Sequence, residues 1–299
     1  MTERSVTVRV PATSANLGPG FDAVGLALQM FADITITVEG AGERRQRPDP
    51  MRRMVATAVR AAYKRADQRL PRGLSVAVKT DIPVGRGLGA SAVARAAGVV
   101  GANAILGGIL DEQTALALGA ELEGHADNIA PALFGGLQVC AMQGNTVSRV
   151  ELPLHPGLRC VGFIPDFSMP THETRALLPK RLSRDDAVHN SSRAALLVAA
   201  LTTGRWDTLS VATDDRLHQR PRSKLFPHMY DLFSAATDAG AFAAYLSGGG
   251  STVIALTDAD HAKTTRDALA AAAAGFEIGG RSFIVEPAAD GARVLRRPQ

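Results

Sequence analysis

A glycine-rich turn between a strand pattern and a helix pattern constrains this chain more than any other segment. Residues 74–78 alternate apolar and polar side chains as a strand does, and a long alanine- and valine-rich run follows Ser91. The turn between them, residues 81–91, carries three glycines. Glycine lets the backbone approach an oxyanion closely, and the first free amides of the next helix point at that anion. The order of strand, glycine turn and helix therefore predicts a phosphate-binding loop.

Other kinds of loop compete for this segment. Gly85-x-Gly87-x-x-Ala90 matches a variant of the dinucleotide fingerprint, and Asp111 follows about 20 residues later, as a ribose-binding acid would. Against this reading, Pro83 separates the strand from the first glycine, and the opening strands do not follow a βαβ order. A Walker loop is excluded because no Gly-Lys-Ser/Thr ends the motif. A turn that only packs the helix on its sheet remains the alternative to a phosphate site.

The residues around this loop suggest a metal site. Ser91 falls in the first turn of the predicted helix, where its hydroxyl would reach a phosphate or a magnesium ion. A polar cluster, residues 121–128 (ELEGHADN), ends another predicted helix that is capped by Asp111. Glu121 would serve as a metal carboxylate if its helix lies beside the glycine turn. Solvation and helix capping are the alternative for this cluster.

Two further segments concentrate polar groups beside glycines. Residues 14–22 (SANLGPGFD) form a bend that holds one amide, Asn16, and one carboxylate, Asp22. Its alternative is a wide strand connection whose polar side chains bond their own backbone. Residues 247–252 (SGGGST) lie between two strand patterns and predict either a second anion nest or a permissive turn.

The remaining patterns predict an α+β chain. The strand patterns cover residues 6–10, 34–38, 137–142, 146–152, 159–164, 241–246, 252–257 and 283–285. The helix patterns cover residues 51–69, 111–123, 184–203, 227–239 and the alanines near 270. Pro131 marks the start of one more segment, and Gly144-Asn145 predicts a hairpin. No internal repeat or low-complexity linker divides the chain.

Composition narrows the classes of partner. The 33 basic residues exceed the 29 acidic ones only slightly, so nucleic acid is not an expected partner. The densest basic run lacks the interleaved aromatic side chains that stack on single strands, and it comprises Arg44, Arg45, Arg47, Arg52 and Arg53. Neither a signal peptide nor a membrane span is expected. Cys140 and Cys160 make no disulfide framework and no zinc spacing, which favours a reducing, cytoplasmic location.

Taken together, four motifs resemble the GHMP kinase superfamily, and most of all its members that act on L-homoserine. Pro83-x-x-x-Gly87-Leu88-Gly89-Ala90-Ser91-Ala92 is similar to the nucleotide loop of that superfamily. The other three motifs are residues 14–22, the segment 125–136 with His-Ala-Asp-Asn and Phe-Gly-Gly, and residues 247–252.

The resemblance implies a fold and a reaction. The fold would be a GHMP kinase fold, with a ribosomal protein S5 domain 2-like N-terminal domain at residues 1–155 and a ferredoxin-like C-terminal domain at 156–299. The reaction would transfer the γ-phosphoryl group of ATP to the side-chain hydroxyl of L-homoserine, with Mg²⁺, on the route to threonine. A homodimer is compatible with the resemblance.

The resemblance also implies roles for individual residues. Ser91 and Glu121 would hold magnesium, and Asn128 would position substrate, with Asp127 as the fallback base. The loop that would cradle the phosphates comprises Pro83, Val84, Gly85, Arg86, Gly87, Leu88, Gly89, Ala90 and Ser91. The residues that would contact homoserine are Asn16, Asp22, His125, Thr171, Arg175 and Arg222. A carboxylate for the ammonium group and arginines for the carboxylate suit an amino-acid zwitterion.

The chain departs from the family pattern in a few places. Ala90 replaces a usual serine of the loop, and Gly249 and Ser251 stand where serine and proline are usual. These departures bear on nucleotide affinity more than on reaction type. Two alternatives stay open: a GHMP kinase that acts on another small alcohol, and a catalytically inactive GHMP-fold metabolite sensor.

Overall fold

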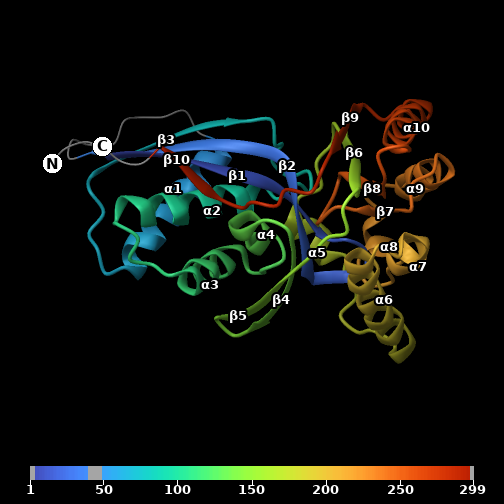
Figure 1. The fold of residues 1–299 in the computed structure, drawn as a ribbon, viewed down its shortest axis with the longest axis horizontal. Coiled ribbons are helices and arrows are strands. Elements are labelled where there is room, and N and C mark those ends of the chain that lie inside the picture. Colours follow the sequence, from blue (N-terminus) through green and yellow to red (C-terminus); the bar gives the residue numbers. More distant parts are fainter. Residues whose placement is uncertain (1–3, 40–48, 297–299) are drawn as a thin grey trace.

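Two antiparallel β-sheets form the framework of the computed structural model, which describes residues 4–39 and 49–296 (Figure 1). The first sheet has the order β10-β1-β2-β4-β5, with β3 paired to β2. Its strands are β1 (Arg4–Asn16), β2 (Gly20–Glu39), β3 (Gly73–Thr80), β4 (Leu137–Gln143), β5 (Thr146–Leu152) and β10 (Arg293–Arg296). The first sheet therefore combines the beginning of the chain with a strand from near its end.

Four helices pack against the first sheet, as Figure 1 shows. They are α1 (Pro50–Arg65), α2 (Ala90–Ile105), α3 (Glu112–Glu123) and α4 (Ile129–Phe134). The alternating strand pattern predicted for residues 6–10 is confirmed, because Val6, Val8 and Val10 are all buried beneath these helices. α2 is lined with alanine and glycine, so that it approaches α1 and the sheet closely. A Cβ at Gly98 would overlap the backbone of α1.

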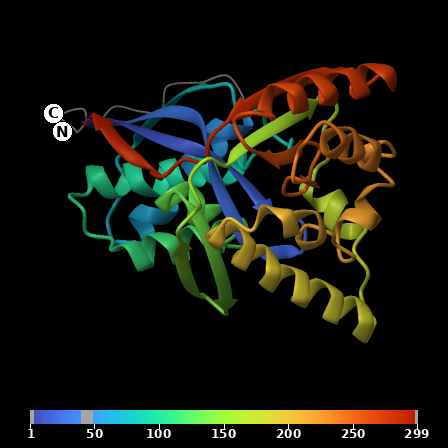
Figure 2. The same cartoon turned by 45° about the vertical axis from the view of Figure 1, so that its right-hand side comes forward.

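The second sheet has the order β7-β8-β6-β9. Its strands are β6 (Arg159–Pro165), β7 (Ala243–Leu246), β8 (Val253–Thr257) and β9 (Gly280–Val285). The helices α9 (Met229–Asp238) and α10 (Ala262–Gly275) pack on this sheet. The chain order β6-α9-β7-β8-α10-β9 with this strand order is the ferredoxin-like arrangement. Figure 2 shows α10, in orange-red, lying over the sheet.

Between β6 and α9 the chain adds several helical segments. These are α5 (Thr171–Ala176), α6 (Arg184–Thr203), a 3₁₀ turn (Trp206–Thr208), α7 (Leu209–Ala212) and α8 (Gln219–Arg222). The predicted helix at 184–203 is confirmed at both ends, where Ser183 caps its start and Gly204 ends it in a left-handed conformation. The short helices α5 and α8 were not expected from the sequence, because segments of four to six residues show no helical period.

Most other predicted elements are confirmed within a few residues, and some expectations need qualification. The helix predicted at 51–69 ends at Arg65. The boundary proposed between residues 155 and 156 falls between β5 and β6, but β10 returns to pair with β1. Of the basic run, Arg44, Arg45 and Arg47 lie outside the described residues. None of the helices in the described part of the chain is long and apolar enough to cross a membrane.

Candidate active site

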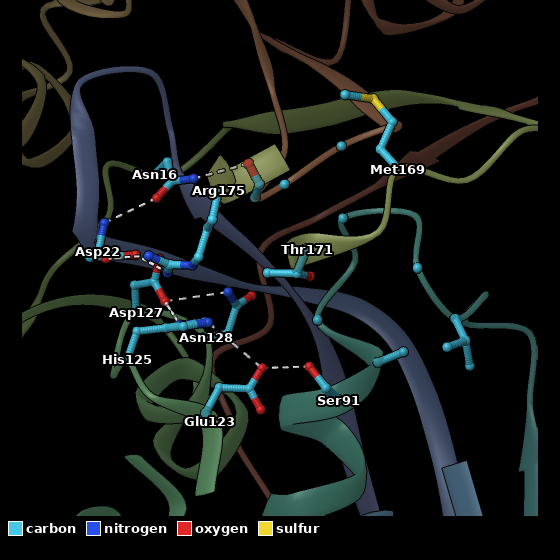
Figure 3. A pocket seen from close by; sticks show the side chains of 18 of the residues that line it. Asn16, Asp22, Ser91, Glu123, His125, Asp127, Asn128, Met169, Thr171 and Arg175 are labelled. Atoms are coloured by element: carbon cyan, nitrogen blue, oxygen red, sulfur yellow. Dashed lines mark hydrogen bonds and ion pairs between the residues drawn. The ribbon is translucent and has the colours of Figure 1, made fainter. Parts of the chain in front are cut away.

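A pocket opens where the two sheets meet, and the four sequence motifs all contribute to its lining (Figure 3). The turn after β1, the loop before α2 and the end of α3 contribute lining residues from the first half of the chain. The loop between β7 and β8, residues 247–252, and the start of α5 come from the other half of the chain. Motifs that are separated by more than 200 residues in sequence therefore face one cavity.

The glycine loop before α2 is held in a conformation that only glycine supports without strain. Gly87 and Gly89 both have positive φ angles, 79° and 67°. A Cβ at Gly87 would overlap the carbonyl oxygen of Ser247, and a Cβ at Gly89 would overlap the hydroxyl of Thr13. Gly89 is the N-cap of α2 and has no side chain, so the first amides of this helix have no side-chain cap. The loop therefore presents backbone donors to the pocket, as an anion site requires.

The predicted loop residues divide between the pocket and the surrounding packing. Six of them line the pocket, namely Val84, Gly85, Gly87, Gly89, Ala90 and Ser91. Leu88 is fully buried in the core, where it anchors the loop. Arg86 donates through Nη1 to the carbonyl of Pro165 at the end of β6. Pro83 precedes the pocket-lining part of the loop and is not among the lining residues.

Ser91 and Glu123 form a corner of hard oxygen donors at the start of α2. The Ser91 hydroxyl donates to Glu123 Oε1 at 2.5 Å, and the side chain of Glu123 is only 6% exposed. Arg95, one turn further along α2, forms an ion pair with Glu123 Oε2. Burial lowers the pKa of Arg95. A hydroxyl and a buried carboxylate are the hard oxygen ligands that Mg²⁺ takes together with phosphate oxygens, so these residues fit the ion.

The sequence predicts Glu121 as the metal carboxylate, but the structure places Glu121 outside the pocket. Glu121 points away from the pocket and bonds Arg65 of α1 at 2.6 Å, with its side chain 51% exposed. Two residues along a helix correspond to a turn of about 200°, so Glu121 and Glu123 lie on nearly opposite faces. Glu123, and not Glu121, is the carboxylate of α3 that lines the pocket.

The turn between β1 and β2 places Asn16 and Asp22 in the pocket through an unusual backbone. Asn16, Leu17 and Asp22 all have positive φ angles, which non-glycine residues rarely adopt. Asn16 is buried, donates through Nδ2 to the Gly248 carbonyl and accepts the Asp22 amide through Oδ1. Such strained conformations persist where the surrounding contacts hold them, and they are common at binding sites.

Arg175 and Asp22 form a two-point ion pair across the pocket. Arg175 Nη1 and Nη2 donate to the two carboxylate oxygens of Asp22 at 3.0 and 2.6 Å. The hydrogen bond to Asp22 raises the pKa of Arg175. The ring of Phe21 lies under Arg175 and also under Arg222, with centroid distances of 5.3 and 5.5 Å. The electron-rich face of the Phe21 ring attracts both guanidinium groups, so Arg175 and Arg222 can both lie at the same pocket.

Arg222 is a buried cation that lines the pocket. It is 2% exposed, and its Nη1 donates to both the Gly248 carbonyl and His218 Nδ1, each at 2.9 Å. Burial and the charge of Arg175 lower the pKa of Arg222 to about 10, so it remains charged at neutral pH. Its Nε is buried and makes no hydrogen bond to the described residues. Arg222 is therefore poised to bind an anion.

His125, Asp127 and Asn128 follow the end of α3 and line the same pocket. His125 Nδ1 lies 2.5 Å from Asp127 Oδ1, and its Nε2 lies 3.8 Å from Glu123 Oε1. Asn128 Oδ1 accepts the hydroxyl of Thr13 at 2.7 Å, and its Nδ2 donates to Asp127 Oδ1 at 3.4 Å, which leaves one amide hydrogen for a ligand. Thr171, at the start of α5, also lines the pocket (Figure 3).

The structure thus brings together all the predicted homoserine contacts, and it adds residues that the sequence analysis missed. Glu123 could have been found from helical spacing, because Leu116, Gly119, Ala120 and Glu123 make one buried stripe along α3. No sequence pattern singled out Phe21 or Thr13 as a site residue. Tyr245 was also missed. The hydroxyls of Ser14, Tyr245 and Ser247 are buried and form a chain that ends on the Gly87 carbonyl.

Comparison with known families gives two matches. The model described as GHMP kinases N terminal domain matches residues 53–136, and the model described as GHMP kinases C terminal matches residues 197–275. The first match contains the glycine loop, Glu123 and Asn128. The second contains Arg222 and the loop 247–252.

Known proteins that bear the name homoserine kinase are similar over most of the chain. The one from Moorella thermoacetica is 45% identical over 258 residues, which are 83% of this chain and 86% of the relative. The one from Clostridium beijerinckii is 39% identical over 85% of this chain and 86% of the relative. The one from Caldanaerobacter subterraneus is 35% identical over 100% of this chain and 98% of the relative.

Solved structures show the same similarity. The crystal structure of homoserine kinase from Cytophaga hutchinsonii has a TM-score of 0.87 and 27% identity, with 97% of each chain covered. The crystal structure of mevalonate diphosphate decarboxylase from Staphylococcus aureus has a TM-score of 0.73 at 14% identity, with 99% of each chain covered. The second similarity concerns the fold alone.

Proposed function

The chain belongs to the GHMP kinase family, and we propose that it transfers the γ-phosphoryl group of ATP to the side-chain hydroxyl of L-homoserine. The product would be O-phospho-L-homoserine, an intermediate of threonine biosynthesis. The predicted GHMP kinase fold is confirmed by the family matches and by the similar solved structures. We place the reaction in the cytoplasm.

The observation that carries the proposal is the charge pattern around Asp22. One carboxylate, Asp22, faces two guanidinium groups, Arg175 and Arg222, in a single pocket that also holds the phosphate loop. An amino-acid zwitterion carries the complementary pair, an ammonium group and a carboxylate. Such a ligand would replace the Asp22–Arg175 ion pair by two charge-assisted contacts of its own. A neutral polyol would leave the buried Arg222 without a carboxylate partner, which is costly. An isoprenoid acid would offer that carboxylate but no ammonium group for Asp22.

The nucleotide half of the pocket supports an ATP-dependent kinase. The loop from Val84 to Ala90 and the first turn of α2 offer backbone donors for the triphosphate. Magnesium would be held by Ser91 and Glu123 and would supply charge neutralisation on the phosphates. The oxygen ligands of Ser91 and Glu123, together with the kinase family, support ATP with Mg²⁺ as the cofactors.

Asn128 provides positioning rather than proton removal. Its Oδ1 accepts from the Thr13 hydroxyl and its Nδ2 donates to Asp127 Oδ1, so one Nδ2 hydrogen is left for a ligand. An amide cannot take a proton at neutral pH. In the transfer, the homoserine hydroxyl oxygen bonds the γ-phosphorus while the bond to the β-bridging oxygen breaks. The proton leaves with phosphate or water, which a loose transition state permits. Asp127, whose carboxylate bonds His125, is the alternative proton acceptor.

A coupled assay of ADP release tests the proposal. ATP and Mg²⁺ are supplied with L-homoserine, L-serine, L-threonine, mevalonate or no acceptor. Stimulation by L-homoserine alone supports the proposed function. Stimulation by mevalonate or another acceptor would keep the kinase and overturn the substrate. ATP binding without turnover on any acceptor would favour the sensor alternative.

A further inference from the structure

A histidine behind the pocket connects two parts of the acceptor site. His218 is fully buried, precedes α8 and does not belong to the pocket lining. Its Nε2 lies 2.7 Å from the Gly18 carbonyl oxygen, in the turn between β1 and β2. Its Nδ1 lies 2.9 Å from Nη1 of Arg222. The ring of His218 therefore contacts both Arg222, which lines the pocket, and the turn between β1 and β2, which would bind the acceptor and is called the acceptor turn below.

The partners of His218 fix its tautomer. A carbonyl oxygen can only accept, so Nε2 carries the hydrogen and donates to Gly18. A guanidinium nitrogen can only donate, so Nδ1 is unprotonated and accepts from Arg222. Burial lowers the pKa of His218 to about 4, which agrees with a neutral ring between these two partners.

The surroundings hold His218 itself in place. Asp215 is buried and accepts the backbone amides of Leu217, His218 and Gln219, which fixes the start of α8. The ring of His218 packs on Phe21 with a centroid distance of 5.4 Å. The Thr213 carbonyl lies so close to Gly18 that a Cβ there would overlap it. The segment from Thr213 to Arg222 and the acceptor turn therefore form one packed unit.

We propose that His218 is a positioning residue that orients Arg222 and the turn at Gly18 together, and so sets the preference for an acceptor that carries a carboxylate. This inference rests on the proposed function, because it assigns Arg222 to the carboxylate of the acceptor. With Nη1 committed to His218 and Gly248, and with Nε buried inside the protein, Nη2 of Arg222 is left to meet the ligand. Without His218 the guanidinium would lose a partner that fixes its plane.

Three substitutions separate the two contacts of the ring. His218→Ala removes both. His218→Asn places an amide oxygen near the position of Nδ1 and keeps the acceptor for Arg222, and His218→Gln places an amide nitrogen near Nε2 and keeps the donor to Gly18. His261→Gln is the matched control, because His261 bonds Asp258 outside the pocket.

The measured quantities are kcat and the KM values for L-homoserine and ATP. We expect H218A to raise the KM for L-homoserine by about 10- to 100-fold, the effect of a lost buried hydrogen bond to a charged group, while the KM for ATP stays within about twofold. H218N should raise the homoserine KM less than H218Q does. The reverse order, or an equal rise in both KM values, would overturn the role of His218 in orienting Arg222.

A double-substitution cycle with Arg222→Met tests whether the effect passes through Arg222. If it does, adding H218A to R222M leaves the homoserine KM unchanged, whereas independent effects multiply and would overturn the inference. H218N and H218Q retain polar volume and remain informative if H218A does not fold. Wild-type protein that shows no homoserine-dependent ADP release would defeat the proposed function. An active wild type with unchanged H218A kinetics would defeat only the present inference.

Discussion

Thr13 donates its hydroxyl hydrogen to Oδ1 of Asn128 at 2.7 Å, and both side chains are buried beside the glycine loop. This contact fixes which end of the asparagine amide faces the pocket. The same hydroxyl lies where a Cβ at Gly89 would go, so strand β1, the phosphate loop and the start of α4 meet at this hydrogen bond. The contact therefore turns Nδ2, the donor end of the Asn128 amide, away from Thr13.

Asn128→Ala should therefore lower kcat and leave substrate binding nearly intact. Removal of one oriented donor to a transferring group costs about 100-fold in rate. Steady-state kinetics with L-homoserine should show this loss in kcat with little change in either KM. Asn103→Ala is the control, because Asn103 bonds Leu110 away from the pocket. A normal kcat in N128A would contradict the positioning role.

The two glutamates of α3 offer a matched pair for the metal site. Glu123→Gln should raise the Mg²⁺ concentration needed for half-maximal activity and lower kcat/KM for ATP by about 100-fold, because it removes a buried carboxylate next to Ser91. Glu121→Gln should change activity by less than about twofold, since an exposed ion pair contributes little. A magnesium titration of both variants checks the difference. If both substitutions changed the Mg²⁺ requirement equally, Glu121 would have to be a metal ligand as well.

Asp22→Asn should raise the KM for L-homoserine by about tenfold or more, because an amide replaces the carboxylate that would bind the ammonium group. The control is Asp33→Asn. Asp33 forms the same two-point ion pair with Arg9, at 2.7 Å for both bonds and with comparable exposure, but outside the pocket. Kinetics of both variants at saturating ATP give the comparison. A rise of the KM in D33N as large as that in D22N would point to stability instead of binding.

The neutral state of His218 makes the free energy of unfolding depend on pH. Its pKa is about 4 in the folded protein because of burial, and about 6.5 in an unfolded chain. Between these values the unfolded state binds a proton that the folded state does not, so stability falls as pH falls from 6.5 to 4. The carboxylates of Asp215 and Asp22 and the cation Arg222 face the ring and set the size of this effect.

Urea unfolding at pH 7 and pH 5 measures this contribution. The wild type should lose about 2 kcal/mol more than His218→Gln over this interval, because glutamine does not titrate. Other titrating groups contribute equally to both proteins, so they cancel when the two changes in the free energy of unfolding are subtracted. Parallel losses in both proteins would show that His218 is not held neutral.

Gly87→Ala should disturb the phosphate loop. A Cβ at this position overlaps the Ser247 carbonyl, and the backbone has a positive φ angle. Displacement of the loop by about 1 Å can cost about 100-fold in rate, so kcat/KM for ATP should fall by that order. Gly275→Ala, at the end of α10 with open space around it, is the control. Measuring kcat/KM for ATP in both variants tests whether the close contact between Gly87 and the Ser247 carbonyl is needed for activity. Equal values in G87A and G275A would contradict it.

Much of the fold could be predicted from the sequence because its strands alternate and its helices carry caps and stops. The helix predicted at 184–203 and the N-cap at Asp111 follow from local rules. The length of β2 and the pairing of β10 with β1 could not be predicted, since both depend on contacts between distant segments.

The site divides in the same way. Asn16, Asp22, Arg175 and Arg222 could be assigned from motifs. The choice between Glu121 and Glu123 depends on which face of α3 meets α2, and motif spacing does not contain that information. The contacts of His218 join Gly18 to a residue 200 positions away in the sequence, so they are visible only in the folded chain.

The pairing of β10 with β1 has a consequence for the way the protein is made. The first strand cannot acquire its outer neighbour until residue 296 has been synthesised, long after its own helices are available. During translation one side of β1 is an open edge that can pair with a strand of another chain. Fragments that stop before residue 293 would keep this edge, so truncation should promote aggregation even where the catalytic pocket is left whole.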